Sequence, residues 1–269
     1  MPAAGPSELE AALIIRSKSP RRLAEQIGAL NSIAGYRLHA EAPQPIHDLY
    51  FDTAGRVLAA KRIALRLRTI GSDHLLTVKG PSRLTDWGAA ERPELEEPYS
   101  TEAVARMVDV LGRAGIALGR AGAARRVPSM KDAPRAVVQA LGLAVVQDRE
   151  THRQPRSVTR PDDPRGTVLA ELAMDTVIYH FEAKTVQMYE IEIEAKSAGG
   201  ASAVKTIIER LVAQFAPALH PWPYGKLVTG QTIERLLREG AFDGLLEPDQ
   251  TLSPAAFERI EDVLTQESP

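Results

Sequence analysis

The sequence predicts an α+β protein in which antiparallel strands follow one another as a meander and helices interrupt and end the series. Two observations support this prediction. Segments between residues 46 and 98 alternate apolar and polar side chains with a period of two, and turn-forming residues such as Gly71-Ser-Asp73 separate them. From Thr101 the apolar residues follow helical spacing instead, at Val104, Met107 and Leu111.

The first strand is expected over residues 8–15. Ser19 and Pro20 then mark the start of a helix over about residues 21–32, because serine is a good N-cap and proline at the first helical position loses no hydrogen bond. Four more strands are expected before the helical region, near residues 46–51, 62–70, 73–79 and 90–98.

Residues 100–142 are expected to form a helical insertion between two groups of strands. One helix includes Val104 to Leu111 and another covers about residues 136–141, with a connection rich in Gly, Ala and Arg between them. The elements expected after the insertion are strands near 143–150, 156–160, 167–180 and 186–196, and helices near 202–215, 231–239 and 254–264.

Two arginines on one strand give the first indication of function. A strand points alternate side chains to the same side, so Arg66 and Arg68 share one face of their segment. Leu65 and Leu67 share the other face. The planar guanidinium group binds phosphate oxygens through paired hydrogen bonds. The arginine face is therefore suited to an anion.

Carboxylates alternate with apolar residues in three other segments, which are Glu8-Leu-Glu10, Glu94-Leu-Glu96 and Tyr189-Glu-Ile-Glu-Ile-Glu194. Like charges on neighbouring strands repel, so such rows need cations or metal ions beside them. Two interpretations are open: acidic and basic rows that face a common interior, or ordinary sheets with one solvated, charged face. The recurrence of the pattern favours the first.

In this order along the chain, the segments resemble the CYTH domains, the triphosphate tunnel metalloenzymes that include inorganic and thiamine triphosphatases and class IV-type adenylate cyclases. The resemblance extends from Glu8 to about Gly230. Its specific pieces are Glu8-x-Glu10, Tyr50-Phe-Asp-Thr53, Leu65-Arg-Leu-Arg68, Leu76-Thr-Val-Lys-Gly80, Arg92-x-Glu94-x-Glu96, Met174-Asp175, Glu190-x-Glu192 and Lys226-Leu-Val-Thr-Gly230.

The resemblance implies an eight-stranded antiparallel closed β-barrel that forms a triphosphate tunnel, with flanking helices and the helical insertion at about 100–142. It also implies a tunnel domain over residues 7–230, followed by a C-terminal helical tail over 231–269.

Individual residues acquire roles through the same resemblance. The phosphate-binding candidates are Arg66, Arg68, Lys79, Arg92, Arg149 and Lys226. The metal-binding candidates are Glu8, Glu10, Glu190 and Glu192, and the catalytic candidates are Glu8, Glu10, Arg66 and Lys79. Carboxylate oxygens without His or Cys at matching spacing favour hard cations, so we expect Mg²⁺ or Mn²⁺.

One position departs from the family pattern. The family's first strand usually reads Glu-x-Glu-x-Lys, and Ala12 stands where the lysine is expected. That lysine is associated with catalysis in the family. The departure therefore implies that this protein binds its ligand tightly but hydrolyses it more slowly than such binding would suggest.

Composition excludes several other classes of protein. A formal net charge of −2 gives no global attraction to nucleic acid or to anionic membranes. The absence of Cys excludes disulfides, a thiolate nucleophile and Cys-ligated zinc. No segment approaches the roughly 20 apolar residues of a membrane span, and the first residues do not resemble a signal peptide, so we expect a cytoplasmic protein.

The leading functional hypothesis is metal-dependent hydrolysis of triphosphate compounds, with inorganic triphosphate as the expected substrate. A small triphosphate or polyphosphate is thus the expected partner. Two alternatives remain at this point. One is cyclisation of ATP to cyclic AMP, for which the chain offers no readable purine-binding motif. The other is a non-catalytic module that binds polyphosphate or nucleotide, which the alanine at position 12 makes credible.

Overall fold

The computed structural model describes residues 7–118, 133–182 and 184–267. The chain divides into two compact units. The first unit consists of Met1–Glu8, Ile46–Arg83 and Glu91–Arg149, and the second consists of Leu9–Pro45, Leu84–Ala90 and Glu150–Pro269. The division into residues 7–230 and 231–269 follows the family resemblance instead, and it remains a proposal.

Eight antiparallel strands form a closed β-barrel, which confirms the fold expected from the sequence. Their order is β10-β11-β1-β8-β6-β5-β4-β9, and β9 also pairs with β10. These strands are β1 (Ser7–Ile15), β4 (Gln44–Thr53), β5 (Ala64–Ile70), β6 (Asp73–Lys79), β8 (Ala90–Pro98), β9 (Leu143–Thr159), β10 (Ala170–His180) and β11 (Thr185–Ala195). Four shorter strands join the sheet: β2 (Ser32–Ile33), β3 (Tyr36–Ala40), β7 (Arg83–Leu84) and β12 (Leu219–Pro221).

The strands of the first unit carry an apolar face that helices cover. Leu65 and Leu67 of β5 belong to a buried cluster that also contains Met107 and Leu111 of α3 (Thr101–Arg113). The short helices α2 (Val57–Ala60) and α4 (Pro134–Ala140) contribute to the same cluster. The alternate residues of β5, Arg66 and Arg68, therefore lie on the opposite, polar face.

Helices α3 and α4 confirm the two helices expected within residues 100–142. Ser100 caps α3, because its side chain accepts a hydrogen bond from the Ala103 N–H. Ala103, Met107 and Leu111 follow at intervals of four and form the buried stripe of the helix. Most of the connection rich in Gly, Ala and Arg lies in residues 119–132, outside the described residues.

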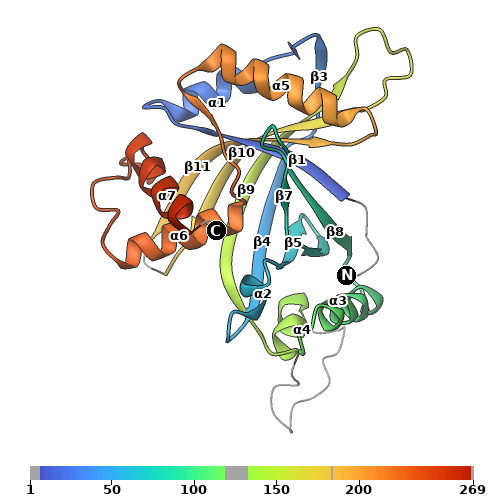
Figure 1. Ribbon diagram of the computed structural model, residues 1–269, viewed down its shortest axis with the longest axis vertical. Coiled ribbons are helices and arrows are strands. Elements are labelled where there is room, and N and C mark those ends of the chain that lie inside the picture. Colours follow the sequence, from blue (N-terminus) through green and yellow to red (C-terminus); the bar gives the residue numbers. More distant parts are fainter. Residues whose placement is uncertain (1–6, 119–132, 183, 268–269) are drawn as a thin grey trace. The chain divides into compact units, whose positions relative to one another are not determined.

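Two apolar clusters stabilise the second unit. The first contains Leu13 of β1 and Ile191 of β11, covered by Ile27 of α1 (Pro20–Gly28) and Ile207 of α5 (Gly200–Phe215). Figure 1 shows α1 and α5 on the same side of these strands. The second cluster contains side chains of β1, β10 and β11 together with α6 (Lys226–Arg238) and α7 (Pro254–Glu267).

The structure corrects three boundaries. The helix expected to extend to residue 32 ends at Gly28, because β2 and β3 form a hairpin in which Ala34 (φ 52°) and Gly35 (φ 84°) make the turn. The helix expected at 231–239 begins at Lys226.

No helix among the residues that the structure describes is long and apolar enough to cross a membrane.

The third correction concerns β9, which is one continuous strand rather than two strands at 143–150 and 156–160. The expected break lies at Pro155, which cannot donate a backbone hydrogen bond. Its carbonyl still accepts a hydrogen bond of 3.0 Å from the Glu41 N–H. A missing donor at this position therefore does not end the strand.

Candidate functional site

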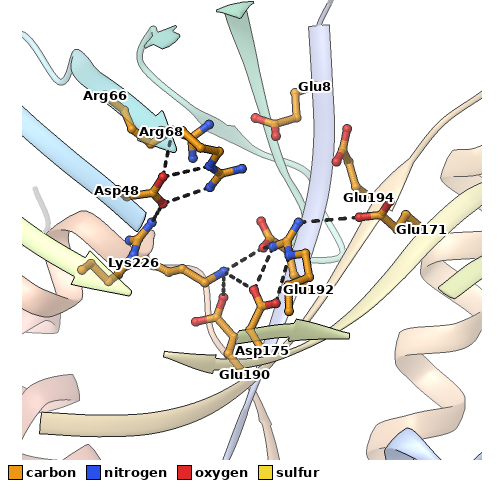
Figure 2. Close-up of polar contacts among 12 residues, drawn as sticks. Glu8, Asp48, Arg66, Arg68, Glu171, Asp175, Glu190, Glu192, Glu194 and Lys226 are labelled. Atoms are coloured by element: carbon orange, nitrogen blue, oxygen red, sulfur yellow. Dashed lines mark hydrogen bonds and ion pairs between the residues drawn. The ribbon is translucent and has the colours of Figure 1, made fainter. Parts of the chain in front are cut away.

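A buried aspartate lies at the centre of the arginine face in the first unit. Arg68 donates two hydrogen bonds to Asp48, from Nε at 2.8 Å and from Nη2 at 3.0 Å. Arg66 Nε lies 3.8 Å from the same carboxylate (Figure 2). Arg149 Nη2 also donates to Asp48, at 2.5 Å. The register explains the arrangement, because Asp48 of β4 is paired with Arg68 of β5 and Tyr50 with Arg66.

Electrostatics make this cluster permanently charged. Burial would raise the pKa of Asp48, but the charges of Arg66, Arg149 and Arg68 hold it far below its ordinary value. The Asp48 side chain is fully buried and that of Arg149 is 1% exposed. Three guanidinium groups surround Asp48, and Arg66 also contacts Glu96, so two carboxylates face three positive charges and an anion can balance the charge that remains.

A second group in the first unit contains Lys79, Arg92 and two carboxyl groups. Lys79 Nζ donates to both oxygens of Glu8 at 2.9 Å and lies 3.2 Å from Glu94. Arg92 Nε donates to Glu8 at 2.9 Å. On the neighbouring strands, Arg66 Nη2 donates to Glu96 at 2.7 Å and lies 3.9 Å from Glu94.

Glu8 and Glu94 share a hydrogen bond and have very different pKa values. Burial would raise the pKa of Glu8, but Lys79, the hydrogen bond from Glu94 and Arg92 lower it to about 2. Burial, the hydrogen bond to Glu8 and the charge of Glu8 raise the pKa of Glu94 to about 7. At neutral pH Glu8 is therefore ionised, whereas Glu94 holds its proton more strongly than an ordinary glutamate does.

This pair predicts a pH dependence of stability. Glu94 binds its proton more tightly in the folded protein than in the unfolded chain, so its contribution to stability is complete below about pH 4.5 and is lost as the pH rises through about 7. We expect Glu94→Gln, whose amide donates to Glu8 without titrating, to flatten stability between pH 5.5 and pH 8.5.

Urea unfolding across the same pH range, with a chelator present, measures this dependence. At about pH 8.5 the variant should exceed the wild type by on the order of 1–2 kcal/mol. Glu97→Gln is the matched control, because this residue lies three positions further along β8 and its change leaves the Glu8–Glu94 pair intact. Parallel pH profiles for the wild type and Glu94→Gln would refute the prediction.

The second unit holds its own charged cluster around Lys226, the first residue of α6. Lys226 Nζ lies 2.5 Å from Glu190, 2.7 Å from Glu192 and 3.3 Å from Asp175 (Figure 2). Arg153 of β9 donates two hydrogen bonds to Asp175, at 2.9 and 2.8 Å, and a further one to Glu192.

Negative charge exceeds positive charge in this cluster. Burial would raise the pKa of Glu192, but Lys226 and Arg153 hold it well below its ordinary value, with help from a hydrogen bond to Glu10. Burial raises the pKa of Glu190 in spite of Lys226. One oxygen of Glu190, Oε2, is buried and has no hydrogen-bond partner. Such an oxygen is costly unless a cation binds it.

These donors fit a divalent cation by their chemistry. Glu10, Glu190 and Glu192 offer hard carboxylate oxygens, and the excess negative charge and the unpaired Glu190 oxygen would both be neutralised by Mg²⁺ or Mn²⁺. Within the described residues, no three His, Cys, Asp or Glu side chains form a group already placed to hold a metal ion.

The structure brings several predicted residues together and adds two that the sequence reasoning missed. Arg66, Arg68 and Arg149 meet at Asp48, Lys79 and Arg92 meet at Glu8, and Glu10, Glu190, Glu192 and Lys226 belong to the second-unit cluster. The missed residues are Asp48 and Arg153. Asp48 alternates with the buried Tyr50 on β4, and this spacing was available in the sequence; Arg153 had no comparable pattern around it.

Ala12 lies at the edge of the second-unit cluster. It is paired with Glu192 across β1 and β11, and its side chain packs against the apolar cluster of α6 and α7. Its carbonyl accepts a hydrogen bond of 2.8 Å from the Trp222 N–H. Trp222 is itself buried in that cluster and donates from Nε1 to Thr229. Trp222 therefore packs in the apolar cluster beside α6 and α7.

Comparisons with known proteins agree with this fold. The family model of the CYTH domain matches residues 15–217. A candidate adenylyl cyclase from Hippeastrum, described as having a dominant triphosphatase activity, is 17% identical with a TM-score of 0.50, over 87% of this chain and 96% of that one. A candidate adenylate cyclase from Bacillus halodurans is 18% identical with a TM-score of 0.45, over 82% of this chain and 96% of the other. A search of the curated proteins found no match.

Proposed function

The chain belongs to the CYTH domain family, and from this premise we propose that it is a metal-dependent triphosphatase that hydrolyses inorganic triphosphate or a closely related compound. Family members bind triphosphate substrates and generally use divalent metals. The observation that carries the proposal is the excess positive charge around Asp48. Three arginines held by one buried carboxylate have their guanidinium groups fixed in place, and such groups bind phosphate oxygens through paired hydrogen bonds.

In this proposal the first unit binds phosphate through its cations. Arg66, Arg68 and Arg149 are oriented by Asp48, and Lys79 and Arg92 are oriented by Glu8. Positioning and charge stabilisation account for most of the catalysis of phosphoryl transfer, so fixed cations are the main requirement. The buried ion pairs fix them before the substrate arrives.

The second unit is proposed to hold the metal through Glu10, Glu190 and Glu192. When bound, a divalent cation neutralises phosphate charge and helps to activate water. The reaction forms a bond between a water oxygen and the terminal phosphorus and breaks the bond from that phosphorus to its bridging oxygen. The products of inorganic triphosphate are then orthophosphate and diphosphate.

A phosphate-release assay tests the proposal directly. Purified protein is incubated with inorganic triphosphate, thiamine triphosphate or ATP, each with Mg²⁺ or Mn²⁺, and both phosphate and cyclic AMP are measured. Metal-dependent phosphate release without cyclic AMP supports the proposal. Cyclic AMP from ATP would favour a cyclase, and tight triphosphate binding without turnover would favour a binding module.

The metal assignment predicts a specific defect in Glu192→Gln. This change keeps the size of the side chain and removes its charge, so the concentration of Mg²⁺ or Mn²⁺ that gives half-maximal activity should rise by about tenfold or more. The measurement is the initial rate at increasing free metal. Glu209→Gln, on the exposed side of α5, is the matched control. An unchanged metal dependence in a folded Glu192→Gln protein would remove Glu192 from the metal site.

A further inference from the structure

A hollow of about 370 Å³ lies in the second unit, where the hairpin of β2 and β3 meets α5. The hairpin contributes residues 32–37, and the C-terminal half of α5 contributes Arg210 and Gln214. Pro161, which follows β9, completes the lining. None of the residues that line the hollow belongs to the charged clusters described above. Its volume is in the range of small-molecule sites, about 300–1,000 Å³.

One part of the lining is apolar and is fixed by the fold. Ile33 belongs to the buried cluster that α1 and α5 cover, and Tyr36 packs against the same cluster. The two residues are paired across the hairpin. The Leu38 N–H also donates a hydrogen bond of 2.9 Å to the Asn31 carbonyl, at the base of the hairpin. The aromatic ring of Tyr36 is therefore held in place on a preformed apolar surface.

Two arginines give the hollow a positive charge. Arg37 of β3 and Arg210 of α5 both line it, and both are exposed. Neither side chain makes a hydrogen bond or an ion pair with another residue that the structure describes. No Asp or Glu is among the residues that line the hollow. With no acidic partner, the two charges attract an anion, and guanidinium groups bind phosphate oxygens through paired hydrogen bonds.

Neutral polar groups complete the lining. Ser32 supplies a hydroxyl group and Gln214 supplies an amide. Neither side chain makes a hydrogen bond with another side chain within the described part of the chain. A hydroxyl group and an amide can each donate and accept hydrogen bonds, as the heteroatoms of an organic ring or a sugar require. The hollow thus combines an apolar surface, a positive charge and a few neutral polar groups, which is the usual composition of a ligand site.

We propose that this hollow is a second ligand site, which binds a small aromatic phosphate ester of about the size of a mononucleotide. The phosphate group binds Arg37 and Arg210, and the flat ring lies against Tyr36 and Pro161. A free phosphate ion is much smaller than the hollow and would leave its apolar surface uncovered. The inference does not depend on the proposed triphosphatase activity, because no residue is shared between the two sites.

Isothermal titration calorimetry with nucleoside monophosphates tests the site. The probes are adenosine 5′-monophosphate (AMP) and uridine 5′-monophosphate, and a chelator is present throughout. We expect the tighter of the two to bind wild-type protein at least about tenfold more tightly than its nucleoside, which lacks the phosphate, and than orthophosphate, which lacks the ring. Failure of both probes to bind would overturn the inference, and so would equal affinity for the probe and either of its parts.

A double variant locates the binding in the hollow. Arg37→Gln/Arg210→Gln removes both charges from exposed positions, and the affinity for the tighter probe should fall at least about tenfold. Arg22→Gln/Arg259→Gln removes the same charge from exposed positions of α1 and α7 and is the matched control. The control should bind the probe as the wild type does. Unchanged affinity in the first variant, or an equal loss in the control, would refute the site.

Hydrolysis of inorganic triphosphate separates this inference from the proposed function. The Arg37→Gln/Arg210→Gln protein should keep the wild-type kcat/KM for inorganic triphosphate while it loses affinity for the nucleoside monophosphate. Loss of both properties together would place the probe in the triphosphate site and overturn the second site. If the wild type does not hydrolyse inorganic triphosphate at all, the proposed function fails. The titrations of the wild type and the two double variants still test the hollow in that case.

Discussion

Asp48→Asn is expected to lower the free energy of unfolding by about 3–5 kcal/mol, the range for breaking a buried ion pair. The change removes the carboxylate to which Arg68 and Arg149 both donate hydrogen bonds, and it leaves their guanidinium groups buried beside that of Arg66. An asparagine of the same size keeps the packing. The loss therefore reports the uncompensated charge rather than a cavity.

Urea unfolding at pH 7 measures this effect, and Asp73→Asn, at the exposed start of β6, is the matched control with an expected change within about 0.5 kcal/mol. The pKa of Asp48 is lowered in the folded protein, so its contribution is present above the ordinary pKa of aspartate and is lost as the pH falls below it. The loss of stability of Asp48→Asn relative to the wild type should therefore be the same at every pH between 6 and 8. A loss below about 1 kcal/mol would refute the assigned role.

Addition of inorganic triphosphate should partly reverse the loss of stability in Asp48→Asn if phosphate can replace the missing carboxylate. Ligand binding raises the apparent stability in proportion to the logarithm of ligand concentration over Kd. We therefore expect a larger stabilisation of Asp48→Asn than of the wild type at the same triphosphate concentration. This comparison separates a purely structural aspartate from one that holds the arginines ready for an anion.

The charged faces could be predicted from the sequence because strand periodicity is a local property. The spacing of Arg66 and Arg68 placed both on one side of β5, and the apolar cluster formed by Leu65 and Leu67 with α3 bears this out. The paired glutamates at 190 and 192 were found in the same way, opposite the buried Ile191. In each case the prediction needed only two charged residues that lie two positions apart in one segment.

The contacts between segments could not be predicted in this way. Arg153 reaches Asp175 and Glu192 because β9 passes beyond Pro155 as a single strand, whereas the sequence suggested a break there. Lys226 acts from the first turn of α6, a helix that the sequence predicted to begin only at residue 231. Both contacts depend on tertiary pairing, which single-segment patterns do not specify.

The position of Ala12 shows what a departure from a family pattern can mean. On the sequence alone the missing lysine suggested only a weaker enzyme. In the structure Ile14 belongs to the apolar cluster that contains side chains of α6 and α7, and Ala12 packs against it. A longer side chain at residue 12 would have to fit beside this cluster, and overpacking of an apolar cluster typically costs about 1–3 kcal/mol. Insertion of a lysine there is therefore a change in packing as well as in charge.

Lys226→Met is expected to produce the largest loss of activity, with kcat for triphosphate hydrolysis falling by about 10²–10³-fold, the range for removal of one group that stabilises charge in the transition state. Methionine keeps most of the apolar stem. The ammonium group is lost between Glu190, Glu192 and Asp175, so these carboxylates repel one another and any phosphate nearby.

Initial rates over a range of triphosphate concentrations separate effects on kcat from effects on KM, and circular dichroism shows whether the variant is folded. Lys226→Arg keeps the charge, so its kcat should be at least about tenfold higher than that of Lys226→Met. Lys205→Met on α5 should leave the rate unchanged. The pKa of Lys226 is raised above its ordinary value, so this lysine stays charged from pH 6 to pH 9 and the defect should be independent of pH in that range. A folded Lys226→Met protein with wild-type kcat would show that the lysine has only a structural role.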